Sequence, residues 1–474
     1  MTKATKGILD LIIVGAGPAG LAAAAESARL GLTVEVFDEN PAPGGQIYRN
    51  VANQPATDSG ILGPDYFYGA NLVSEAISSG AAFSASSTVW MIERHEEEAL
   101  FAVGVQRGDG AEILTARRIL IATGALERPF PVKGWTLPGV MTAGAAQTML
   151  KASGVVPEGR VVLAGTGPLL YLLAAQFARA SAPLAAILDT TPRVNWLKAL
   201  PHLPGFLASG YFRKGLGLLA EVRRSTRIVP GVTQFEAGGD GRLEYIGYQT
   251  RGQKERLRAD VLLLHQGVAP HVNLAMAAGC KHIWNDNRLA FEPHVDEAFR
   301  SSVKGLSIAG DGIGISGASA AEAMGRIAAF HMAHDLGKLS AVDLERFTER
   351  PRFRLRKALR GRSFIDALYR PAENFRMPDD DVVVCRCEEV KAGAVRAAAR
   401  GGAQGPNQVK TFLRTGMGPC QGRLCGLTVT EVMACQSGKS PGDIGYFHIR
   451  NPVKPITLGA LAALKTDGET TRLF

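Results

Sequence analysis

A glycine-rich loop lies near the start of the chain, between an apolar run and an alanine-rich stretch, and it narrows the possible folds. Leu11–Val14 is the apolar run, the loop reads G-A-G-P-A-G over residues 15–20, and the alanine-rich stretch reaches about Leu30. An alternating segment then ends at Asp38. This order predicts a strand, a tight turn, a helix and a second strand, which together form a dinucleotide-binding unit.

Residues of this loop have separate physical roles. Gly15 makes the tight turn, Gly17 lets a pyrophosphate approach the backbone, and Gly20 lets the helix pack closely on the strand. Asp38 stands at the end of the second strand, where a carboxylate can bond ribose hydroxyls. The loop therefore predicts a dinucleotide site rather than a structural turn.

Other stretches have the composition of nucleotide loops. Gly44 and Gly45 let the chain pass close to a flat ring system, although an ordinary turn would use the same residues. One buried strand runs into Ala122-Thr123-Gly124, and another into Gly310-Asp311-Gly312 before a helix that begins near Ala318.

A second glycine fingerprint lies between these stretches. Gly165 and Gly167 follow an apolar strand, and the next strand ends at Asp189. The third glycine is replaced by Leu170. The Rossmann-like fold of this unit is expected, whereas nucleotide binding stays open; if a nucleotide binds, Asp189 favours a ribose with a free 2′-hydroxyl.

Over residues 8–340 these motifs resemble the two-dinucleotide-binding-domain flavoproteins, relatives of glutathione and thioredoxin reductases. The resemblance implies FAD in the first unit, and NAD or another adenine nucleotide as the candidate for the second. It assigns to FAD the residues Gly15, Gly17, Pro18, Ala19, Gly20, Asp38, Glu39, Gly44, Gly45, Gln46, Thr123, Gly124, Asp311 and Gly312. Gly165, Gly167 and Asp189 would hold the second nucleotide.

The chain departs from the disulfide reductases in its cysteines. No cysteine precedes Cys280, which stands alone. Thiol–disulfide exchange requires two thiols, so we exclude a dithiol mechanism beside the flavin. Cys280 is expected to be a buried apolar residue.

Four later cysteines form two close pairs, Cys385-x-Cys387 and Cys420-x4-Cys425. Four thiolates are the ligand set of a [2Fe–2S] cluster, with two thiolates for each iron. A structural zinc site is the alternative, but zinc knuckles usually read C-x2-C. Glycines around the second pair would leave N–H groups free to bond sulfur, and Arg386, Arg414 and Arg423 could offset the negative charge. Cys435 is expected in the core.

This segment resembles the bacterioferritin-associated ferredoxin-like domain, in which all four cysteines are ligands, although that domain usually ends in C-x2-C. The string 416–425, with the stretches 265–268 and 310–322, resembles a narrower group. It contains the A subunits of opine oxidases, the B subunit of hydrogen cyanide synthase and the α subunits of multimeric proline or hydroxyproline dehydrogenases. In these complexes an amino-acid-oxidase-like β subunit oxidises the amine, and the subunit that resembles this chain collects the electrons.

The expected fold class is α/β, with two Rossmann-like domains, one inserted in the other, and a small, mainly helical [2Fe–2S] domain. The predicted boundaries are 8–150 with 260–340 for FAD, 151–259 for the second unit, 341–376 for a basic connector, 377–440 for the cluster domain and 441–474 for a tail.

Charge is concentrated near the end of the chain. Residues 1–344 carry 31 basic and 31 acidic residues, whereas residues 345–376 carry 10 basic and 4 acidic ones. A uniformly basic nucleic-acid coat is therefore excluded. The connector is either a solvated helix or a docking surface.

The sequence thus predicts a flavin-dependent oxidoreductase, the electron-transfer subunit of a multisubunit amino-acid, opine or proline-type dehydrogenase. Its expected partner is an amino-acid-oxidase-like β subunit, with or without a small additional subunit, and neither nucleic acid nor a transmembrane segment is expected. The electron acceptor and the residues that oxidise the amine are not identified. We expect a cytoplasmic chain, at most peripheral to the inner face of the membrane through partners. The alternatives are a self-contained NADH-dependent ferredoxin or quinone reductase, and a non-catalytic iron or zinc protein on a vestigial flavin fold.

Overall fold

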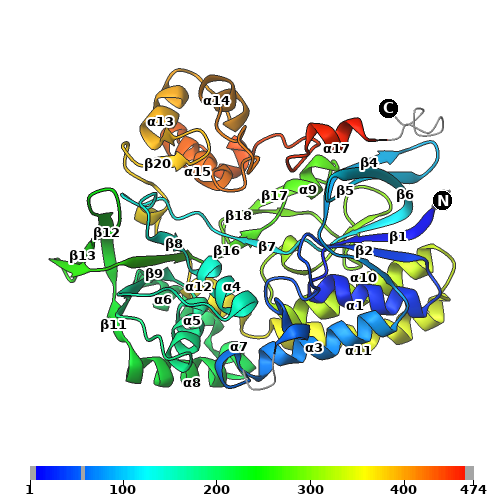
Figure 1. Ribbon diagram of the computed structural model, residues 1–474, viewed down its shortest axis with the longest axis horizontal. Coiled ribbons are helices and arrows are strands. Elements are labelled where there is room, and N and C mark those ends of the chain that lie inside the picture. Colours follow the sequence, from blue (N-terminus) through cyan, green and yellow to red (C-terminus); the bar gives the residue numbers. More distant parts are fainter. Residues whose placement is uncertain (1–6, 55–58, 465–474) are drawn as a thin grey trace.

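The computed structural model describes residues 7–54 and 59–464 (Figure 1). Two sheets, each with helices packed on it, lie side by side, and a small helical module sits above them. The α/β class with two Rossmann-like units is confirmed. No helix in the described residues is long and apolar enough to cross a bilayer.

The first sheet has seven strands and a parallel centre. Leu11 and Ile13 of β1 face one hydrophobic core, and Ile12 and Val14 face another. A parallel strand covered on both faces must be apolar throughout, which explains the unbroken run in the sequence. The strand order is β3 (Ala82–Ser84), β2 (Val34–Phe37), β1 (Leu9–Val14), β6 (Gly110–Ile121), β5 (Leu100–Arg107) and β4 (Ser87–His95), with β19 (Leu306–Ile308) beside the end of β6.

Helices cover one face of this sheet. α1 (Pro18–Arg29) packs on α10 (Ala318–Asp335) at very short range, because a Cβ at Gly325 would lie 2.1 Å from the carbonyl oxygen of Ala19. α3 (Pro64–Ser78) packs on α1, α2 (Ser59–Leu62) lies against α3, and α11 (Ala341–Leu359) packs against α10.

The second sheet is parallel, in the order β11 (Arg227–Pro230), β10 (Ala186–Asp189), β9 (Val161–Thr166), β15 (Val261–Gln266) and β8 (Val140–Thr142). The antiparallel ribbon of β7 (Ala125–Glu127) and β16 (Val268–Pro270) connects it to the first body. Its helices are α4 (Ala143–Ser153), α5 (Pro168–Arg179), α6 (Val194–Ala199), α7 (Leu203–Leu207) and α8 (Gly210–Ser225). A small antiparallel sheet follows, β12 (Val232–Gly238), β13 (Tyr245–Thr250) and β14 (Gln253–Arg258).

After β16 the chain forms α9 (Asn273–Ala277) and the hairpin of β17 (His282–Asn285) and β18 (Ala290–Pro293). α12 (Arg362–Leu368) then packs on α6 and leads to the module. The module contains β20 (Val383–Cys385), β21 (Val390–Lys391), α13 (Ala392–Arg400), α14 (Pro406–Leu413), α15 (Gly426–Ser437) and α16 (Pro441–Ile444), and α17 (Leu458–Ala462) follows.

The module is seated on the first body through a shared core. One hydrophobic cluster runs from Ile119 of β6 through Leu274 of α9 to Val429 of α15. The segment after residue 440 also returns to the first body, where the N–H of Val453 donates to the carbonyl of Trp90 at 2.9 Å. The last ten residues of the predicted tail lie outside the described residues.

The two lone cysteines have different surroundings. Cys280 is buried, as predicted, and donates to the hydroxyl of Ser301 at 3.4 Å. The prediction that Cys435 lies in the core is wrong, because its side chain is exposed. α15 is buried from Gly426 to Ala434, and the helix emerges from the core at this cysteine.

Candidate functional site

The first glycine loop connects β1 to α1 and leaves the N-terminus of α1 uncovered by side chains. The N-cap is Gly17, no side chain caps the helix, and its first turn carries no acidic residue. One carboxylate oxygen of Asp38 accepts from the N–H of Ala16 at 2.6 Å, and the other accepts from the N–H of Asn40 at 2.8 Å. The free N–H groups and the helix dipole therefore favour an anion at this end of α1.

The contacts that an added Cβ would make distinguish the glycines that the fold requires from the one that leaves room for a ligand. A Cβ at Gly15 would lie 2.5 Å from the carbonyl oxygen of Ala122, and one at Gly20 would lie 1.9 Å from the carbonyl oxygen of Gly15. A Cβ at Gly17 would meet nothing nearer than the Cα of Gly45, at 3.9 Å. The space over Gly17 is therefore free of protein and fits a pyrophosphate.

Gly44 and Gly45 bring a second loop onto the first. The N–H of Gly44 donates to the carbonyl of Ala16 at 2.8 Å, and both glycines have positive φ angles. A Cβ at Gly45 would lie 2.8 Å from the Cα of Gly17. This contact, together with the positive φ of Gly45, explains why the second loop requires glycine at position 45.

A buried lysine that the sequence did not single out supports this loop. Lys151 of α4 donates to the carbonyl of Gln46 at 3.2 Å and to the side chain of Gln147 at 3.3 Å. Arg49 also contacts Gln46, at 3.0 Å. Burial, and then the charge of Arg49, lower the pKa of Lys151 to about 7.

The buried lysine predicts a pH-dependent stability. In the unfolded chain Lys151 keeps its proton to about its ordinary pKa of 10.5, so the unfolded state binds more protons between pH 7 and 10 and stability rises with pH there. Relative to Lys151→Met, we expect the wild-type free energy of unfolding to rise by up to about 1.4 kcal/mol for each pH unit, measured in denaturant. The control is Lys198→Met, at an exposed position, whose free energy of unfolding should change with pH in parallel with wild type. If the difference in free energy of unfolding between wild type and Lys151→Met did not change with pH, the prediction would be contradicted.

Asp311 and Gly312 lie in a short 3₁₀ turn, Gly310–Ile313, before α10. One carboxylate oxygen of Asp311 accepts from the N–H groups of Ser316 and Gly317, at 2.8 and 2.9 Å. These bonds hold the carboxylate beside the start of α10, which has no side-chain cap. Thr123 and Gly124 lie at the end of β6, where the carbonyl of Gly124 accepts from the N–H of His271 at 2.9 Å. Glu39 pairs with Lys454 of the final segment.

The second glycine loop is covered by a buried histidine. A Cβ at Gly167 would lie 3.2 Å from Nε2 of His265 on β15. Nδ1 of His265 contacts a carboxylate oxygen of Glu127 at 2.6 Å, and the other oxygen of Glu127 accepts from the N–H of Gly144 at 2.8 Å. The first loop thus has open space over Gly17, whereas in the second loop the corresponding space over Gly167 is occupied by the imidazole of His265.

The acid of the second unit is also engaged. The hydroxyl of Tyr171 donates to Asp189 at 3.0 Å, and the N–H of Thr191 donates to the other carboxylate oxygen at 2.9 Å. Burial, and then the Asp189 charge, raise the pKa of Tyr171. Tyr171 directly follows Leu170, the residue that replaces the third glycine.

The four module cysteines meet as two pairs. Cys385 contacts Cys425, and Cys387 contacts Cys420. The Cys425 thiol, and backbone N–H groups of which Gly416 supplies one, lower the pKa of Cys385 to about 6. Within the described ranges, no three His, Cys, Asp or Glu side chains converge on a point that could hold one metal ion. Two pairs of thiols can supply the two thiolates that each iron of a [2Fe–2S] cluster requires.

Aromatic side chains from beyond residue 440 hold the second cysteine loop. Cβ atoms at Gly416 and Gly422 would lie 2.9 and 2.7 Å from the ring of Phe447, and one at Gly426 would lie 2.2 Å from the hydroxyl of Tyr446. These glycines are therefore required for packing, a role that the sequence analysis did not assign to them.

The three arginines predicted to offset the cluster charge make other contacts. The guanidinium of Arg386 lies 5.4 Å from the ring centroid of Trp135. Arg414 bonds Glu388 at 3.0 Å, and Arg423 donates to the carbonyl of Val453 at 3.0 Å. Arg386 and Arg423 thus dock the module on its neighbours.

A short segment after β16 connects the two candidate cofactor loops. His271 bonds Gly124 through its backbone, as described above, and the buried side chain of Asn273 donates to the carbonyl of Gln421 at 2.8 Å. Gln421 is the neighbour of Cys420. Burial, and then the charges of Arg423 and Lys454, lower the pKa of His271 to about 3, so its ring is neutral at pH 7.

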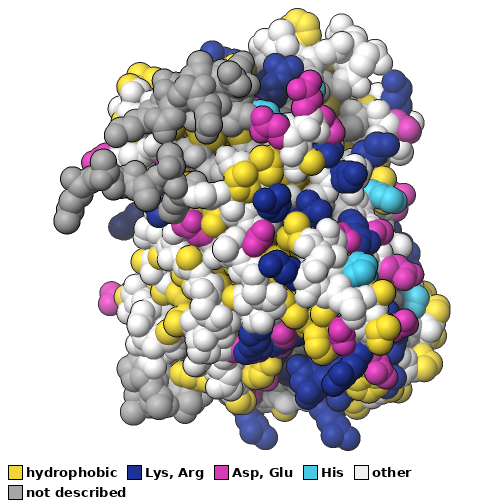
Figure 2. Space-filling view, turned by 90° about the vertical axis from the view of Figure 1, so that its right-hand side faces the viewer, with side chains coloured by type: hydrophobic (Ala, Val, Ile, Leu, Met, Phe, Trp, Pro, Cys, Tyr) yellow, Lys and Arg dark blue, Asp and Glu magenta, His cyan; other side chains and the backbone are white. Residues whose placement is uncertain are grey.

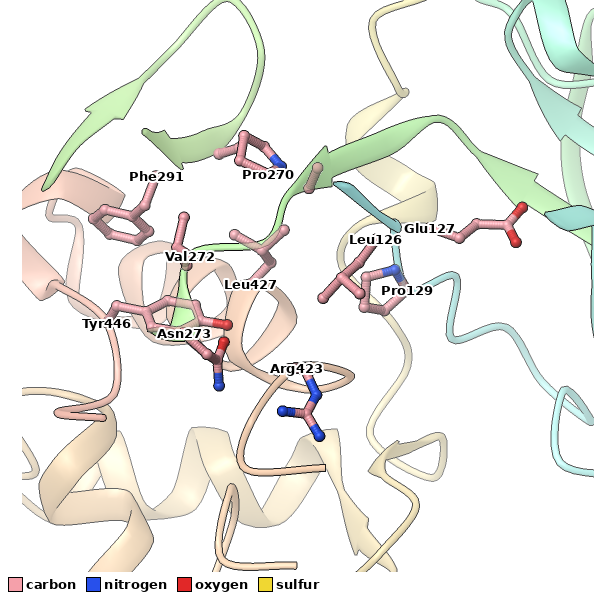
Figure 3. Close-up of a pocket in the computed structure, with 12 residues that line it drawn as sticks. Leu126, Glu127, Pro129, Pro270, Val272, Asn273, Phe291, Arg423, Leu427 and Tyr446 are labelled. Carbon is pink, nitrogen blue, oxygen red and sulfur yellow. The ribbon is translucent and has the colours of Figure 1, made fainter. Parts of the chain in front are cut away.

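A small cavity lies where this segment meets the module (Figure 3). Leu126 and Pro129 line it from the β7 side, and Arg423, Leu427 and Tyr446 line it from the module. Its volume of about 20 Å³ admits a single water molecule, so this cavity is too small for an amino acid.

The chain belongs to the pyridine nucleotide-disulphide oxidoreductase family, whose model matches residues 9–337. A sarcosine oxidase A3 domain model matches residues 382–465. Within this family the chain is 46% identical to the A subunit of opine oxidase from Agrobacterium tumefaciens, over 96% of this chain and 92% of the relative. The HcnB subunit of hydrogen cyanide synthase from Pseudomonas aeruginosa is 30% identical over 96% of this chain and 99% of its own length.

Among solved structures, L-proline dehydrogenase from P. horikoshii has the same fold. The TM-score is 0.73 at 21% identity, and the match covers 97% of this chain and 81% of that chain. The family fold implies FAD binding. The predicted resemblance to the opine oxidase and hydrogen cyanide synthase subunits and the oxidoreductase class are confirmed.

Proposed function

We propose that the chain is the electron-transfer subunit of a multisubunit amino-acid, opine or proline-type dehydrogenase. A partner flavoprotein subunit of the amino-acid-oxidase type would oxidise the amine, and this chain would pass the electrons on singly. Support comes from the relatives, named as subunits of opine oxidase and hydrogen cyanide synthase, which match along nearly the whole chain. A cytoplasmic position, with at most peripheral membrane contact, belongs to the same proposal.

The observation that carries this proposal is the bridge between the two loops. Asn273 is bonded to the carbonyl beside Cys420, and two residues earlier the backbone is bonded to Gly124. FAD supplies two-electron chemistry and a [2Fe–2S] cluster supplies one-electron transfer when they are bound. The bridge would keep the residues that hold them at a constant separation.

For FAD we propose the first loop, Asp38, the Gly44–Gln46 loop and the Asp311 turn. For the cluster we propose Cys385, Cys387, Cys420 and Cys425. We retain the predicted division of the chain, with the cluster domain extended past residue 440 because Tyr446 and Phe447 pack on its loop.

For the second unit we propose a spacer that does not hold NAD. His265 occupies the space where a pyrophosphate would approach Gly167. A self-contained NADH reductase requires that site. The vestigial alternative is disfavoured by the open space over Gly17.

The electron donor distinguishes these functions. We expect NADH to leave the visible flavin absorption of the isolated chain unchanged, because the second loop is filled by side chains. In the complex with its partner subunit, proline, hydroxyproline or an opine should bleach it, whereas the amine without the partner should not. Dithionite is the positive control for a reducible flavin. Rapid bleaching by NADH would favour the reductase, and an isolated chain without flavin bands would favour the vestigial protein.

A further inference from the structure

The second body carries an exposed apolar surface on its short helices. Along α6 and the turn after it, the exposed fractions are 60% for Trp196, 72% for Leu197 and 58% for Leu200. Leu207 of α7 and Leu216 of α8 are about half exposed. α8 has 16 residues, of which only Val222 is buried. We call these residues of α6–α8 the helical edge; such a concentration of large exposed side chains marks an interaction surface.

The same segment is strongly basic. Residues 190–227 contain seven Lys and Arg and one acidic residue, Glu221. Glu221 is engaged by Arg179 at 2.6 Å. No ion pair within the described residues involves the exposed basic side chains Arg193, Lys198, Arg213, Arg223 and Arg224. Residues 1–344 therefore have a net charge of zero as a whole but contain a locally positive segment, residues 190–227.

Folding joins this segment to the basic connector. The hydroxyl of Tyr211 in α8 donates to the carbonyl of Ala358 in α11 at 3.3 Å. A Cβ at Gly361 would lie 2.7 Å from the hydroxyl oxygen of Ser209. Phe353 of α11 is 60% exposed. In Figure 1, α7, α8 and α11 lie along the lower edge, opposite the module, and Lys and Arg side chains gather at the bottom of Figure 2.

We propose that the helical edge and the adjoining part of α11 form a docking surface for a bilayer that contains anionic lipid. Exposed Trp and Leu side chains beside Lys and Arg are the composition of helices that lie in the membrane interface. The excess of one charge sign complements a uniformly anionic surface. The core of a protein–protein interface is depleted of charged residues, whereas this segment carries seven Lys and Arg and one acidic residue. The proposal concerns this chain's own surface and is independent of its electron donor.

Vesicle flotation of the full flavin-containing chain tests the proposal. We expect binding to vesicles of phosphatidylcholine with phosphatidylglycerol, little binding to phosphatidylcholine alone, and a decrease with added salt. The double variant Trp196→Ser with Leu197→Ser should lower the bound fraction at least about tenfold. The matched control is Leu458→Ser with Leu461→Ser, two exposed leucines of α17, which should bind as wild type.

A second measurement avoids any dependence on folding of that variant. Brominated lipid should quench tryptophan fluorescence in wild type, and Trp196→Phe should bind but lose most of the quenching. Absence of binding, equal binding to both vesicles, or quenching that persists in Trp196→Phe would overturn the proposal. It would also fail if the double variant kept its vesicle binding and lost a co-purifying subunit, because the surface would then be a protein interface.

Discussion

Replacing Cys385 or Cys425 with serine should remove the iron–sulfur centre and leave the flavin in place. Both thiols are buried and in contact with each other, so each is expected to be one of two thiolates on the same iron. We expect iron to fall from about two ions per chain to near zero, together with loss of the cluster's visible and paramagnetic signals. Metal analysis and low-temperature electron paramagnetic resonance of the reduced protein would measure this.

The chain contains a matched control for this substitution. Cys435 lies on α15 in the same module, but its side chain is exposed and separate from the two pairs. Cys435→Ser should therefore keep its full iron content. Zinc in place of iron in the wild-type protein would contradict the assignment, and so would an unchanged cluster signal in Cys385→Ser.

Motifs in the sequence predicted those parts of the site whose residues lie close together along the chain. Gly15, Gly17 and Gly20 act within one strand–turn–helix unit, so their spacing alone identifies the loop. Asp38 follows the next strand, and parallel pairing of β1 with β2 brings it beside Ala16. The spacing of the four cysteines predicted pairs of sequence neighbours, whereas in the fold Cys385 contacts Cys425 and Cys387 contacts Cys420.

Contacts between distant parts of the chain could not be predicted in this way. His265 and Glu127 are 138 residues apart, and Asn273 and Gln421 are 148 apart. They meet because the second unit is inserted through the β7–β16 ribbon and the module then folds back onto α9. The signals available for His265 were its place in the stretch 265–268 and the polar pair with Gln266 that ends the apolar strand β15.

Replacing Gly17 with alanine should weaken FAD binding without destabilising the protein that holds no flavin. Gly17 has φ −80°, a conformation open to any residue, and the nearest atom to an added Cβ is 3.9 Å away. The methyl group would instead occupy the space where the pyrophosphate approaches α1. We expect FAD affinity to fall at least about tenfold, or roughly 1.4 kcal/mol, in titrations of the deflavinated protein, with an unchanged denaturation midpoint before FAD is added.

Two other glycine substitutions make this result specific. Gly20→Ala would push a Cβ to 1.9 Å from the carbonyl oxygen of Gly15, so it should lower the stability of the flavin-free protein by about 1–3 kcal/mol or more. Gly217→Ala on α8 meets no atom within 4 Å, so it should leave FAD affinity near wild type and, as a replacement inside an exposed helix, raise stability by up to about 1 kcal/mol. If Gly17→Ala bound FAD normally, the space over Gly17 would not be the pyrophosphate site. If Gly17→Ala lost stability as Gly20→Ala does, its weaker FAD binding would result from a distorted loop. The open space over Gly17 would then not explain the loss of FAD binding.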